Sequence, residues 1–313
     1  MYLVMVFVMH LIRNLKRAID MKETLLSVRD LNLDIELYSG TFRALRDISF
    51  DIFQGDVLGV VGESGCGKSL LAHSLMGLLP KNIKVEAKKL LFENRDLLSL
   101  SLSERQHLRG TKMGMIFQNP MSALNPSLTI EFQLIESLRR SNGDLSQAKL
   151  KEEALHLLSQ VGIPDASKRL HQYPHQMSGG MCQRIMIAMG LAAKPKLLIA
   201  DEPTTALDVT IQKQIIDLLL EIKEKFNITL LFISHDMGLI SHVADKTMVM
   251  YAGEVIENGP TYDVIRKPHH PYAKGLMDSI PGQNHHSQKS LLYSIPGHVP
   301  DLKNRTHGCQ FTI

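Results

Sequence analysis

Eight consecutive residues have the types and spacing of a phosphate-binding loop. The pattern G-x-x-x-x-G-K-S is matched by Gly62, Glu63, Ser64, Gly65, Cys66, Gly67, Lys68 and Ser69. Glycines let backbone N–H groups close around phosphate oxygens, and a helix that begins at the loop adds a favourable dipole. We expect Lys68 to reach the β- and γ-phosphates of a nucleotide, and the Ser69 hydroxyl to bind Mg²⁺.

Four short runs of apolar residues predict the strands that position this loop. They cover residues 57–61, 113–117, 197–200 and 228–234, and helical stretches separate them. Strands that are apolar throughout are typical of a parallel sheet covered by helices on both faces. The first run leads directly into the phosphate loop, as the motif requires.

The other three runs end in polar residues. Gln118 follows the second run, Asp201 and Glu202 the third, and His235 the fourth. Because ligands of open α/β sheets lie beyond the carboxyl ends of the strands, these side chains are expected to converge on one γ-phosphate. We assign Asp201 to Mg²⁺, Glu202 to polarising the attacking water, and His235 to contacting the γ-phosphate, while the Gln118 amide serves both metal and water.

A second helix start has anion-binding chemistry. Ser178, Gly179 and Gly180 offer a hydroxyl and two backbone N–H groups, but a long helical insert separates them from the phosphate loop. Standing alone, Ser178 would be interpreted as an ordinary N-cap. Beside the other motifs, the economical explanation is a two-fold related pair of domains, in which each contributes its Ser-Gly-Gly segment to the ATP on its neighbour.

Composition limits the class of protein. The chain has 313 residues, is 44% hydrophobic and carries a net charge of +3 with both signs mixed along it. This allows one large core and gives no clustered basic face, so a nucleic-acid partner is not expected. The three cysteines, Cys66, Cys182 and Cys309, are scattered and suggest no disulfide framework.

The N-terminal extension, residues 1–22, begins with an apolar run over residues 1–12 that is followed by a basic stretch. This order is the reverse of a secretory signal, and a span needs about 20 apolar residues. Three interpretations stay open: an upstream start codon with Met21 beginning the domain, an interfacial helix, or a disordered tail.

The hydrophobic pattern in the rest of the sequence predicts the other elements of the chain. Alternating residues 25–53 predict antiparallel strands, residues 119–190 a helix-rich insert, and residues 246–259 a hairpin that turns near Ala252. A helix after the phosphate loop is expected to carry four leucines on one face: Leu71, Leu75, Leu78 and Leu79. After Arg266, no hydrophobic periodicity is evident.

Taken together, the motifs resemble those of the nucleotide-binding subunits of ABC transporters. "GESGCGKS" resembles the Walker A motif, "FQNP" the Q-loop, "MSGGM" the signature, "LLIADEP" the Walker B motif, "TALD" the D-loop and "ISHD" the H-loop. The resemblance covers about residues 25–265, in the family's order. It implies an α/β fold: a P-loop NTPase core with a mostly parallel sheet, an N-terminal antiparallel β subdomain and an inserted α-helical signature subdomain.

Longer segments narrow the resemblance to importers of oligopeptides, dipeptides and nickel. They are "FQNPMSALNPSLTI", "DEPTTALDVTIQ" and "PHHPYAKGLMDSIP", and the tail "SIPGHVPDLKNRTHGCQF" favours the peptide members over nickel. Cys182 departs from the family, which often has Arg there. Some peptide members hold an iron–sulfur cluster on further tail cysteines. We expect none here, because Cys309 alone cannot bind one.

The resemblance implies further roles and partners. Tyr38, with Phe42 as the alternative, would stack on the adenine, and Asp208 would lie at the seam between two ATPases. Residues 23–265 would form the ATPase domain and residues 266–313 a shortened C-terminal extension. The partners implied are a related second ATPase, two transmembrane permeases and an extracytoplasmic solute-binding protein, with this subunit on the cytoplasmic side of the bacterial inner membrane.

Two rival classes explain less of the sequence. A soluble ABC-type ATPase acting on DNA or ribosomes usually has a coiled-coil insert or a second ATPase domain, and neither pattern is found here. A simple P-loop kinase explains neither the Ser-Gly-Gly segment nor His235.

Overall fold

The structure is a computed structural model that describes residues 22–141, 144–205 and 207–279, with residues 295, 300, 303 and 308–311. The three interpretations of residues 1–12 therefore concern a segment outside the described residues. Among the residues described, no helix has both the length and the apolar character needed to cross a membrane.

An antiparallel sheet forms the N-terminal part, as the alternating pattern predicts. It consists of β1 (Thr24–Leu37), β2 (Gly40–Phe53), β4 (Ile83–Glu86), β5 (Lys89–Phe92) and β6 (Arg95–Asp96). The long strands β1 and β2 pair with each other, while β4 and β5 pair with the other edge of β1. Its inward-facing residues join the core beneath the phosphate loop.

The central sheet has the order β11-β10-β3-β9-β8-β7. It consists of β3 (Val57–Val61), β7 (Met113–Ile116), β8 (Leu197–Asp201), β9 (Thr229–Ser234), β10 (Lys246–Tyr251) and β11 (Glu254–Pro260). The pairs from β10 to β7 are all parallel, and β11 forms the expected hairpin with β10. The carboxyl ends of β3, β9, β8 and β7 therefore meet at one edge.

This sheet separates two hydrophobic cores. Along β3, Val57 and Val61 face the first core, whereas Leu58 and Val60 face the second. Successive side chains of a strand point to opposite faces, so every residue of β3 is buried and none faces water. The first core lies against α9 (Val209–Phe226) and α10 (Met237–Val243), the second against α2 (Lys68–Met76) and the antiparallel sheet.

Helix α2 is shorter than the leucine spacing predicts. It ends at Met76 because Gly77 adopts the left-handed conformation that closes the last turn, with φ 61°. Leu71 and Leu75 are buried on its inner face, but Leu78 lies beyond the end and is 40% exposed. The expectation that Leu78 and Leu79 share a helical face with the other two leucines is therefore wrong.

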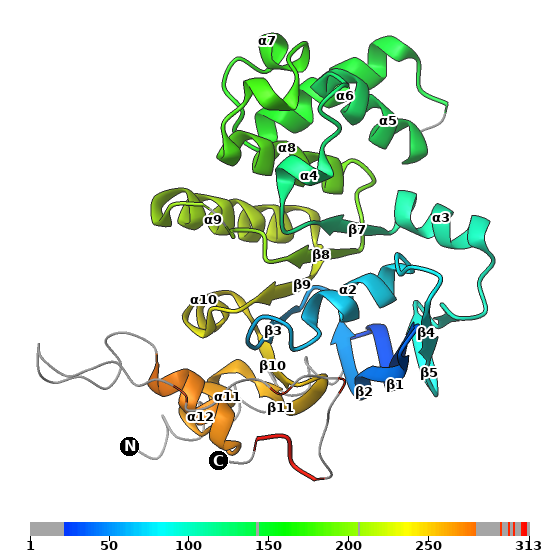
Figure 1. The fold of residues 1–313 in the computed structure, drawn as a ribbon. Helices are drawn as coiled ribbons and strands as arrows, with labels where there is room; N and C mark the ends of the chain where they lie inside the picture. Colours follow the sequence, from blue (N-terminus) through cyan, green and yellow to red (C-terminus); the bar gives the residue numbers. More distant parts are fainter. Residues whose placement is uncertain are drawn as a thin grey trace, which may run out of the picture.

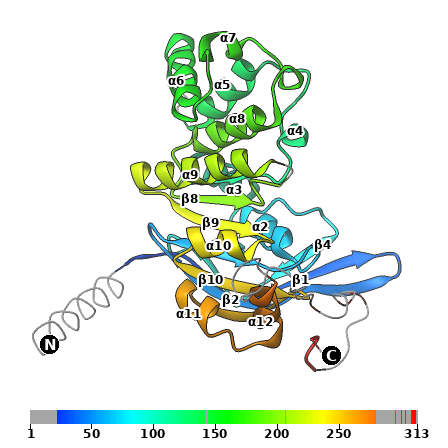
Figure 2. The same cartoon turned by 90° about the vertical axis from the view of Figure 1, so that its left-hand side faces the viewer.

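A helical subdomain projects from one end of the central sheet (Figures 1 and 2). It contains α4 (Pro120–Ala123), α5 (Ile130–Ser141), α6 (Gln147–Gln160), α7 (Ala166–Leu170), a 3₁₀ turn η1 (Pro174–Gln176) and α8 (Gly179–Leu191). These elements fall within the segment predicted to be helical. Helix α3 (Leu102–Thr111) lies before β7 and begins with a capping box between Ser101 and Glu104.

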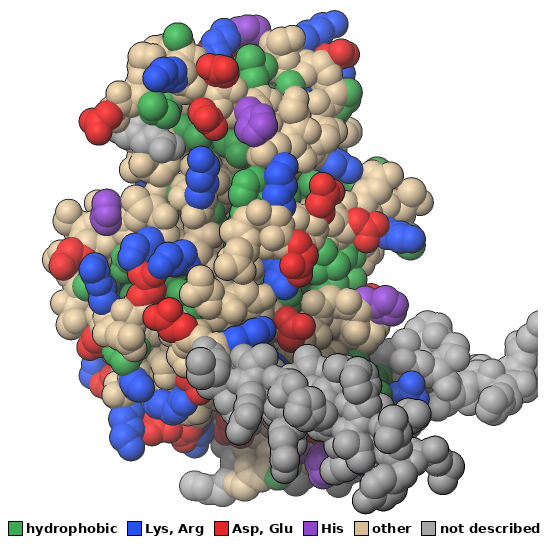
Figure 3. All heavy atoms as spheres, turned by 180° about the vertical axis from the view of Figure 1, so that it is seen from behind, with side chains coloured by type: hydrophobic (Ala, Val, Ile, Leu, Met, Phe, Trp, Pro, Cys, Tyr) green, Lys and Arg blue, Asp and Glu red, His purple; other side chains and the backbone are tan. Residues whose placement is uncertain are grey.

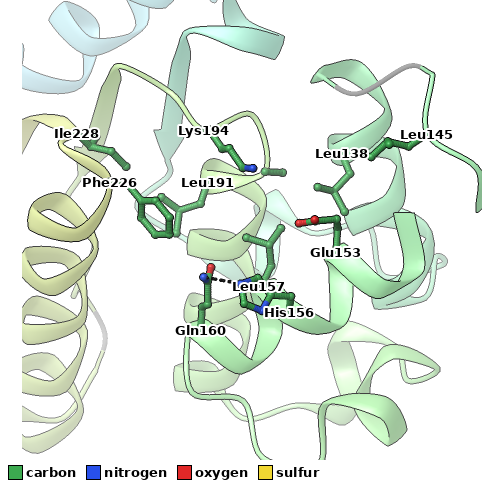
Figure 4. Close-up of a pocket in the computed structure, with 11 residues that line it drawn as sticks. Leu138, Leu145, Glu153, His156, Leu157, Gln160, Leu191, Lys194, Phe226 and Ile228 are labelled. Atoms are coloured by element: carbon green, nitrogen blue, oxygen red, sulfur yellow. Dashed lines mark hydrogen bonds between the residues drawn. The ribbon is translucent and has the colours of Figure 1, made fainter. Parts of the chain in front are cut away.

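A cavity of about 180 Å³ lies where the helical subdomain meets the sheet core (Figure 4). Leu157 of α6, Leu191 of α8 and Phe226 of α9 supply apolar walls, while Glu153 and Lys194 lie at its edge. Packing between these two parts is therefore incomplete at this point.

The C-terminal part adds α11 (Thr261–Arg266) and α12 (Pro271–Asp278) beneath the hairpin (Figure 2). Helix α12 was not anticipated from the sequence, which shows no periodicity after Arg266. It is short, begins with Pro271 and takes its stability from burial, because Tyr272, Ala273 and Leu276 pack against the first core. Elsewhere, charges of both signs intermingle on the surface, as Figure 3 shows for one face.

Replacing Gly253 with alanine tests the turn that joins the hairpin to the antiparallel sheet. Gly253 has φ 79°, and an added Cβ would lie 2.1 Å from the carbonyl oxygen of Ala44. We expect a loss of about 2 kcal/mol or more of unfolding free energy, which lowers the thermal midpoint by several degrees. Gly259→Ala, in the same hairpin with only an ordinary 3.7 Å contact, is the control. Equal midpoints for the two variants would contradict this account.

Candidate active site

The phosphate loop lies between β3 and α2, at the edge where the parallel strands end. Helix α2 begins at Lys68, and Gly67 before it has φ 105°, a backbone conformation in which an added Cβ would lie 2.5 Å from Leu45. The N-terminus of α2 therefore opens directly onto the loop, with backbone N–H groups and the positive end of the dipole facing it.

Lys68 is 4% exposed and is held by its own loop. Its ammonium donates to the carbonyl oxygens of Gly62, at 2.7 Å, and Glu63, at 2.9 Å. It also lies 3.7 Å from the Glu202 carboxylate. A buried ammonium needs such partners, since burial of an unpaired charge is costly. The loop thus holds the lysine close to the place where phosphates are expected.

Asp201 and Ser69 form the second pair of neighbours. The Ser69 hydroxyl donates to Asp201 Oδ1 at 3.1 Å, which joins the start of α2 to the end of β8. Asp201 is 3% exposed. Burial raises the pKa of this carboxyl, and the hydrogen bond from Ser69 opposes that shift. Two hard oxygen donors at one edge fit a divalent cation such as Mg²⁺.

The carboxylate of Glu202 is the point where the strand ends converge. Its Oε2 accepts from the Gln118 amide at 2.9 Å and lies 3.3 Å from His235 Nδ1. The residue follows the last residue of β8 with φ 45°, and its N–H donates to the Ile233 carbonyl of the neighbouring strand. The left-handed conformation shows that the chain turns out of the strand at Glu202.

The predicted Ser-Gly-Gly segment begins α8 and lies beside the start of α9. Ser178 caps α8 by accepting from the Met181 N–H at 3.3 Å, and Asp208 caps α9 by accepting from the Ile211 N–H at 3.0 Å. An added Cβ on Gly180 would lie 3.0 Å from Ile211, so the two helix starts are in close contact. Among the described residues, no hydrogen bond or ion pair joins this segment to Gly62–Ser69.

Tyr38 does not lie among the residues that meet at the ends of the parallel strands. It lies in the turn between β1 and β2, its side chain is fully exposed, and it takes part in none of the contacts that connect the strand ends. Phe42, the alternative, is partly buried on β2, with Lys303 over its ring at 5.9 Å from the centroid. The adenine platform stays a prediction.

Two residues at the site were missed by sequence reasoning. The Thr205 hydroxyl donates to Glu202 Oε2 at 3.0 Å, and the Tyr272 hydroxyl accepts from the Glu63 N–H at 2.9 Å. Thr205 lies three residues after Glu202 and the turn there could have indicated it. Tyr272 comes from α12, more than two hundred residues from the loop, and no local pattern indicates it.

Family models account for most of the chain. The model described as ABC transporter matches residues 45–205, and a second, the oligopeptide/dipeptide transporter C-terminal region, matches residues 256–312. The chain belongs to the ABC transporter family. Its sheet, helical subdomain and antiparallel sheet are those of an ABC ATPase, and the predicted fold is confirmed.

Among curated relatives, this ABC ATPase is 49% identical to the dipeptide transport ATP-binding protein DppD of Bacillus subtilis (strain 168), over 92% of this chain and 86% of that protein. It is 47% identical to DppD of Escherichia coli (strain K12), over 91% and 86%. It is 44% identical to the oligopeptide transport ATP-binding protein OppD of Bacillus subtilis (strain 168), over 92% and 80%. ATP binding and hydrolysis, predicted from the motifs, are confirmed by this membership.

Solved structures of ABC ATPases have a similar fold. The ATP-binding cassette MJ0796, described as a dimer in a post-hydrolysis state with ADP and Pi, is 25% identical with a TM-score of 0.68, covering 75% of this chain and 98% of that one. CbiO1 of Clostridium perfringens, part of an ABC transporter complex, is 29% identical with a TM-score of 0.67, covering 79% and 92%.

Thr205 provides a test of how Glu202 is held. Thr205→Val keeps the shape but removes the hydroxyl, so one hydrogen bond to a charged group is lost; such bonds contribute about 1.5–3 kcal/mol. We expect the kcat for ATP hydrolysis to fall about tenfold with little change in KM. Thr205→Ser, which keeps the hydroxyl, should stay near the wild type. If the valine and serine variants turned over ATP equally, Thr205 would have no role in holding Glu202.

Proposed function

We propose that this chain is the ATP-hydrolysing subunit of an importer that takes up dipeptides and oligopeptides through partner permeases. Its relatives DppD and OppD, and the match of residues 256–312 to the peptide-transporter C-terminal region, support peptides as the cargo. The observation that carries the ATPase chemistry is the convergence of Gln118, His235 and Thr205 on the Glu202 carboxylate, beside Lys68.

In this proposal, Gly62–Ser69 enclose the phosphates of ATP. Lys68, guided by the two loop carbonyls, reaches the β- and γ-phosphates, while Ser69, Asp201 and Gln118 hold Mg²⁺. The Ser69–Asp201 contact of 3.1 Å supports this set of ligands. When bound, Mg²⁺ supplies electrostatic stabilisation of the phosphate oxygens. Tyr38 is assigned to the adenine, as its place in the family's order implies.

Glu202 is proposed as the residue that polarises the attacking water. A carboxylate whose Oε2 is held by an amide, an imidazole and a hydroxyl keeps a fixed direction, and its Oε1, which lies 3.7 Å from Lys68 Nζ, is the oxygen assigned to the water. His235 lies on the exposed side of Glu202 and is assigned to the γ-phosphate, so that the loss of phosphate changes the contacts of β9 and β8 together.

The Ser178–Gly180 segment is proposed to bind the ATP of a second ATPase. Among the residues that the structure describes, no hydrogen bond or ion pair joins it to Gly62–Ser69, and it adjoins the start of α9, where Asp208 lies. A pair of related subunits would therefore place the two helix starts at one seam. The dimeric MJ0796 structure supports such pairing.

A groove beside Gln118 is proposed as the surface that receives a permease. It has a volume of about 360 Å³ and lies between the sheet core and the helical subdomain, with Leu78 and Phe117 on one side and Arg140 on the other. Leu78 and Phe117 are 40% and 36% exposed. Exposed apolar side chains in a concave surface mark a binding site, and Gln118 follows Phe117 directly. The protein would thus lie on the cytoplasmic face of the inner membrane, and a solute-binding protein outside would deliver the peptide.

Glu202→Gln tests the chemical role. The amide keeps the size of the side chain but no longer polarises water, so we expect ATP binding to be retained while kcat falls at least about 100-fold. Binding is measured with a fluorescent ATP analogue and turnover by phosphate release. Glu224→Gln, an exposed carboxylate of α9, is the matched control and should leave both unchanged. Near-normal turnover of the Glu202 variant would remove this residue from its assigned role.

The same variant tests the cargo in cells. A strain without this gene should lose uptake of a radiolabelled dipeptide and keep uptake of radioactive nickel. The wild-type gene should restore peptide uptake, and the Glu202→Gln gene should not. Loss of nickel uptake with intact peptide uptake would overturn the proposed cargo while leaving the ATPase assignment in place.

Leu78→Asp tests the permease surface. A buried carboxylate in the groove would oppose docking, so we expect the variant to lose co-purification with the permeases while its own ATP turnover stays within about twofold of wild type. Leu102→Asp, a leucine that is 70% exposed at the start of α3 and does not line the groove, is the control. Equal co-purification of both variants would exclude the groove as the docking surface.

A further inference from the structure

Tyr272 is the one residue of α12 that reaches the phosphate loop through a hydrogen bond among those the structure describes. Its side chain is completely buried, and its hydroxyl accepts from the backbone N–H of Glu63 at 2.9 Å. The peptide that contains this N–H also contains the Gly62 carbonyl, which accepts from Lys68 Nζ at 2.7 Å. In a trans peptide, C=O and N–H point in opposite directions. Tyr272 and Lys68 therefore hold the two ends of the same peptide group.

The Gly62–Glu63 peptide group has little freedom to rotate. An added Cβ on Gly62 would lie 2.2 Å from the Met250 carbonyl oxygen and 2.8 Å from Cys66 Sγ, so the loop is pressed against the end of β10. If the hydroxyl of Tyr272 were absent, the partly buried Glu63 N–H would lose its side-chain partner. A rotation of the peptide would then change the direction of the Gly62 carbonyl that guides Lys68.

An aromatic cluster fixes the tyrosine itself. The ring of Tyr272 lies 4.5 Å from that of Tyr251, the last residue of β10, measured between centroids. Phe311, in the C-terminal segment, packs edge-on against both rings, at 5.5 Å from Tyr251 and 5.7 Å from Tyr272, and it also contacts His270. Edge-to-face pairs at these distances are favourable, so one residue of β10 and one of the C-terminal segment hold the Tyr272 ring in place.

The protonation of the hydroxyl suits this role. Burial raises the pKa of Tyr272 well above its ordinary value. The ionisable side chains of Glu63, Cys66 and Tyr251 disfavour the charged form as well, whereas the hydrogen bond from the Glu63 N–H acts in the opposite direction. The hydroxyl thus stays neutral throughout the physiological range.

We propose that Tyr272 is a positioning residue for ATP binding, through which the C-terminal extension sets the orientation of the Gly62–Glu63 peptide and so the place of the Lys68 ammonium. The C-terminal extension of this protein then contributes to the ATP site. The inference rests on the proposed role of Gly62–Ser69 as the phosphate loop.

Tyr272→Phe and Tyr251→Phe form a matched pair for the test. Both remove one hydroxyl from the same cluster and keep the ring, but only Tyr272 binds the loop. Two measurements are made on the full-length chain: hydrogen exchange of the loop peptide around Glu63, and the Kd for ATP, with the thermal midpoint as a control for folding. For Tyr272→Phe we expect faster exchange at the loop and a Kd raised about fivefold or more, a loss of about 1 kcal/mol.

Tyr251→Phe should keep both values within twofold of wild type, with a thermal midpoint similar to that of the Tyr272 variant. If both variants behaved alike, or if loop exchange rose while the Kd for ATP stayed unchanged, the proposal would be overturned. Lys68→Ala separates this failure from that of the loop assignment. A Lys68 variant that bound ATP as wild type does would refute the phosphate loop itself, whatever the tyrosine variants showed.

Discussion

The geometry of the site depends on how one carboxylate is held at the edge of the parallel sheet. Glu202 Oε2 lies within hydrogen-bonding distance of three side chains, which come from the end of β7, the end of β9 and the turn after β8. Only a parallel arrangement brings the carboxyl ends of these strands to one edge, and the order β3-β9-β8-β7 puts the phosphate loop at that edge as well. The long segments between the strands, including the whole helical subdomain, are crossovers that this arrangement requires.

Most of this site was accessible from the sequence because it is encoded by short local patterns. An unbroken apolar run predicts a buried strand, and the residue after it falls at the sheet edge, so Gln118, Asp201, Glu202 and His235 could be placed together without coordinates. The strand order could not be derived in this way, since it depends on pairings between distant segments. The sharp turn at Glu202 was also unforeseen, because a left-handed residue after a strand has no distinctive signal when it is not glycine.

The features that the sequence did not predict correctly depend on long-range packing or on where a helix ends. Leu78 carries the right spacing for the face of α2, but Gly77 ends the helix first, and the leucine becomes part of a surface groove. Helix α12 is too short to show periodicity and exists because Tyr272 and its neighbours are buried against the core. The family's order of motifs implied that Tyr38 stacks on the adenine, whereas in the described structure Tyr38 is an exposed residue of a turn.

The two halves of the site are held in different ways, and this difference suits their tasks. The phosphate loop is fixed through its backbone: Gly253 N–H donates to the Cys66 carbonyl, Arg46 N–H donates to Gly253, and Tyr272 accepts from Glu63. Three distant segments thus determine the loop's shape, and a fixed cradle is what electrostatic stabilisation of phosphate requires. The Glu202 carboxylate, in contrast, is held by side chains, and one of these, Gln118, belongs to the segment that enters the helical subdomain. In the proposed mechanism, a shift of that subdomain would withdraw Gln118 from Glu202 without distorting the loop, so ATP binding and the timing of hydrolysis would be separable within one chain.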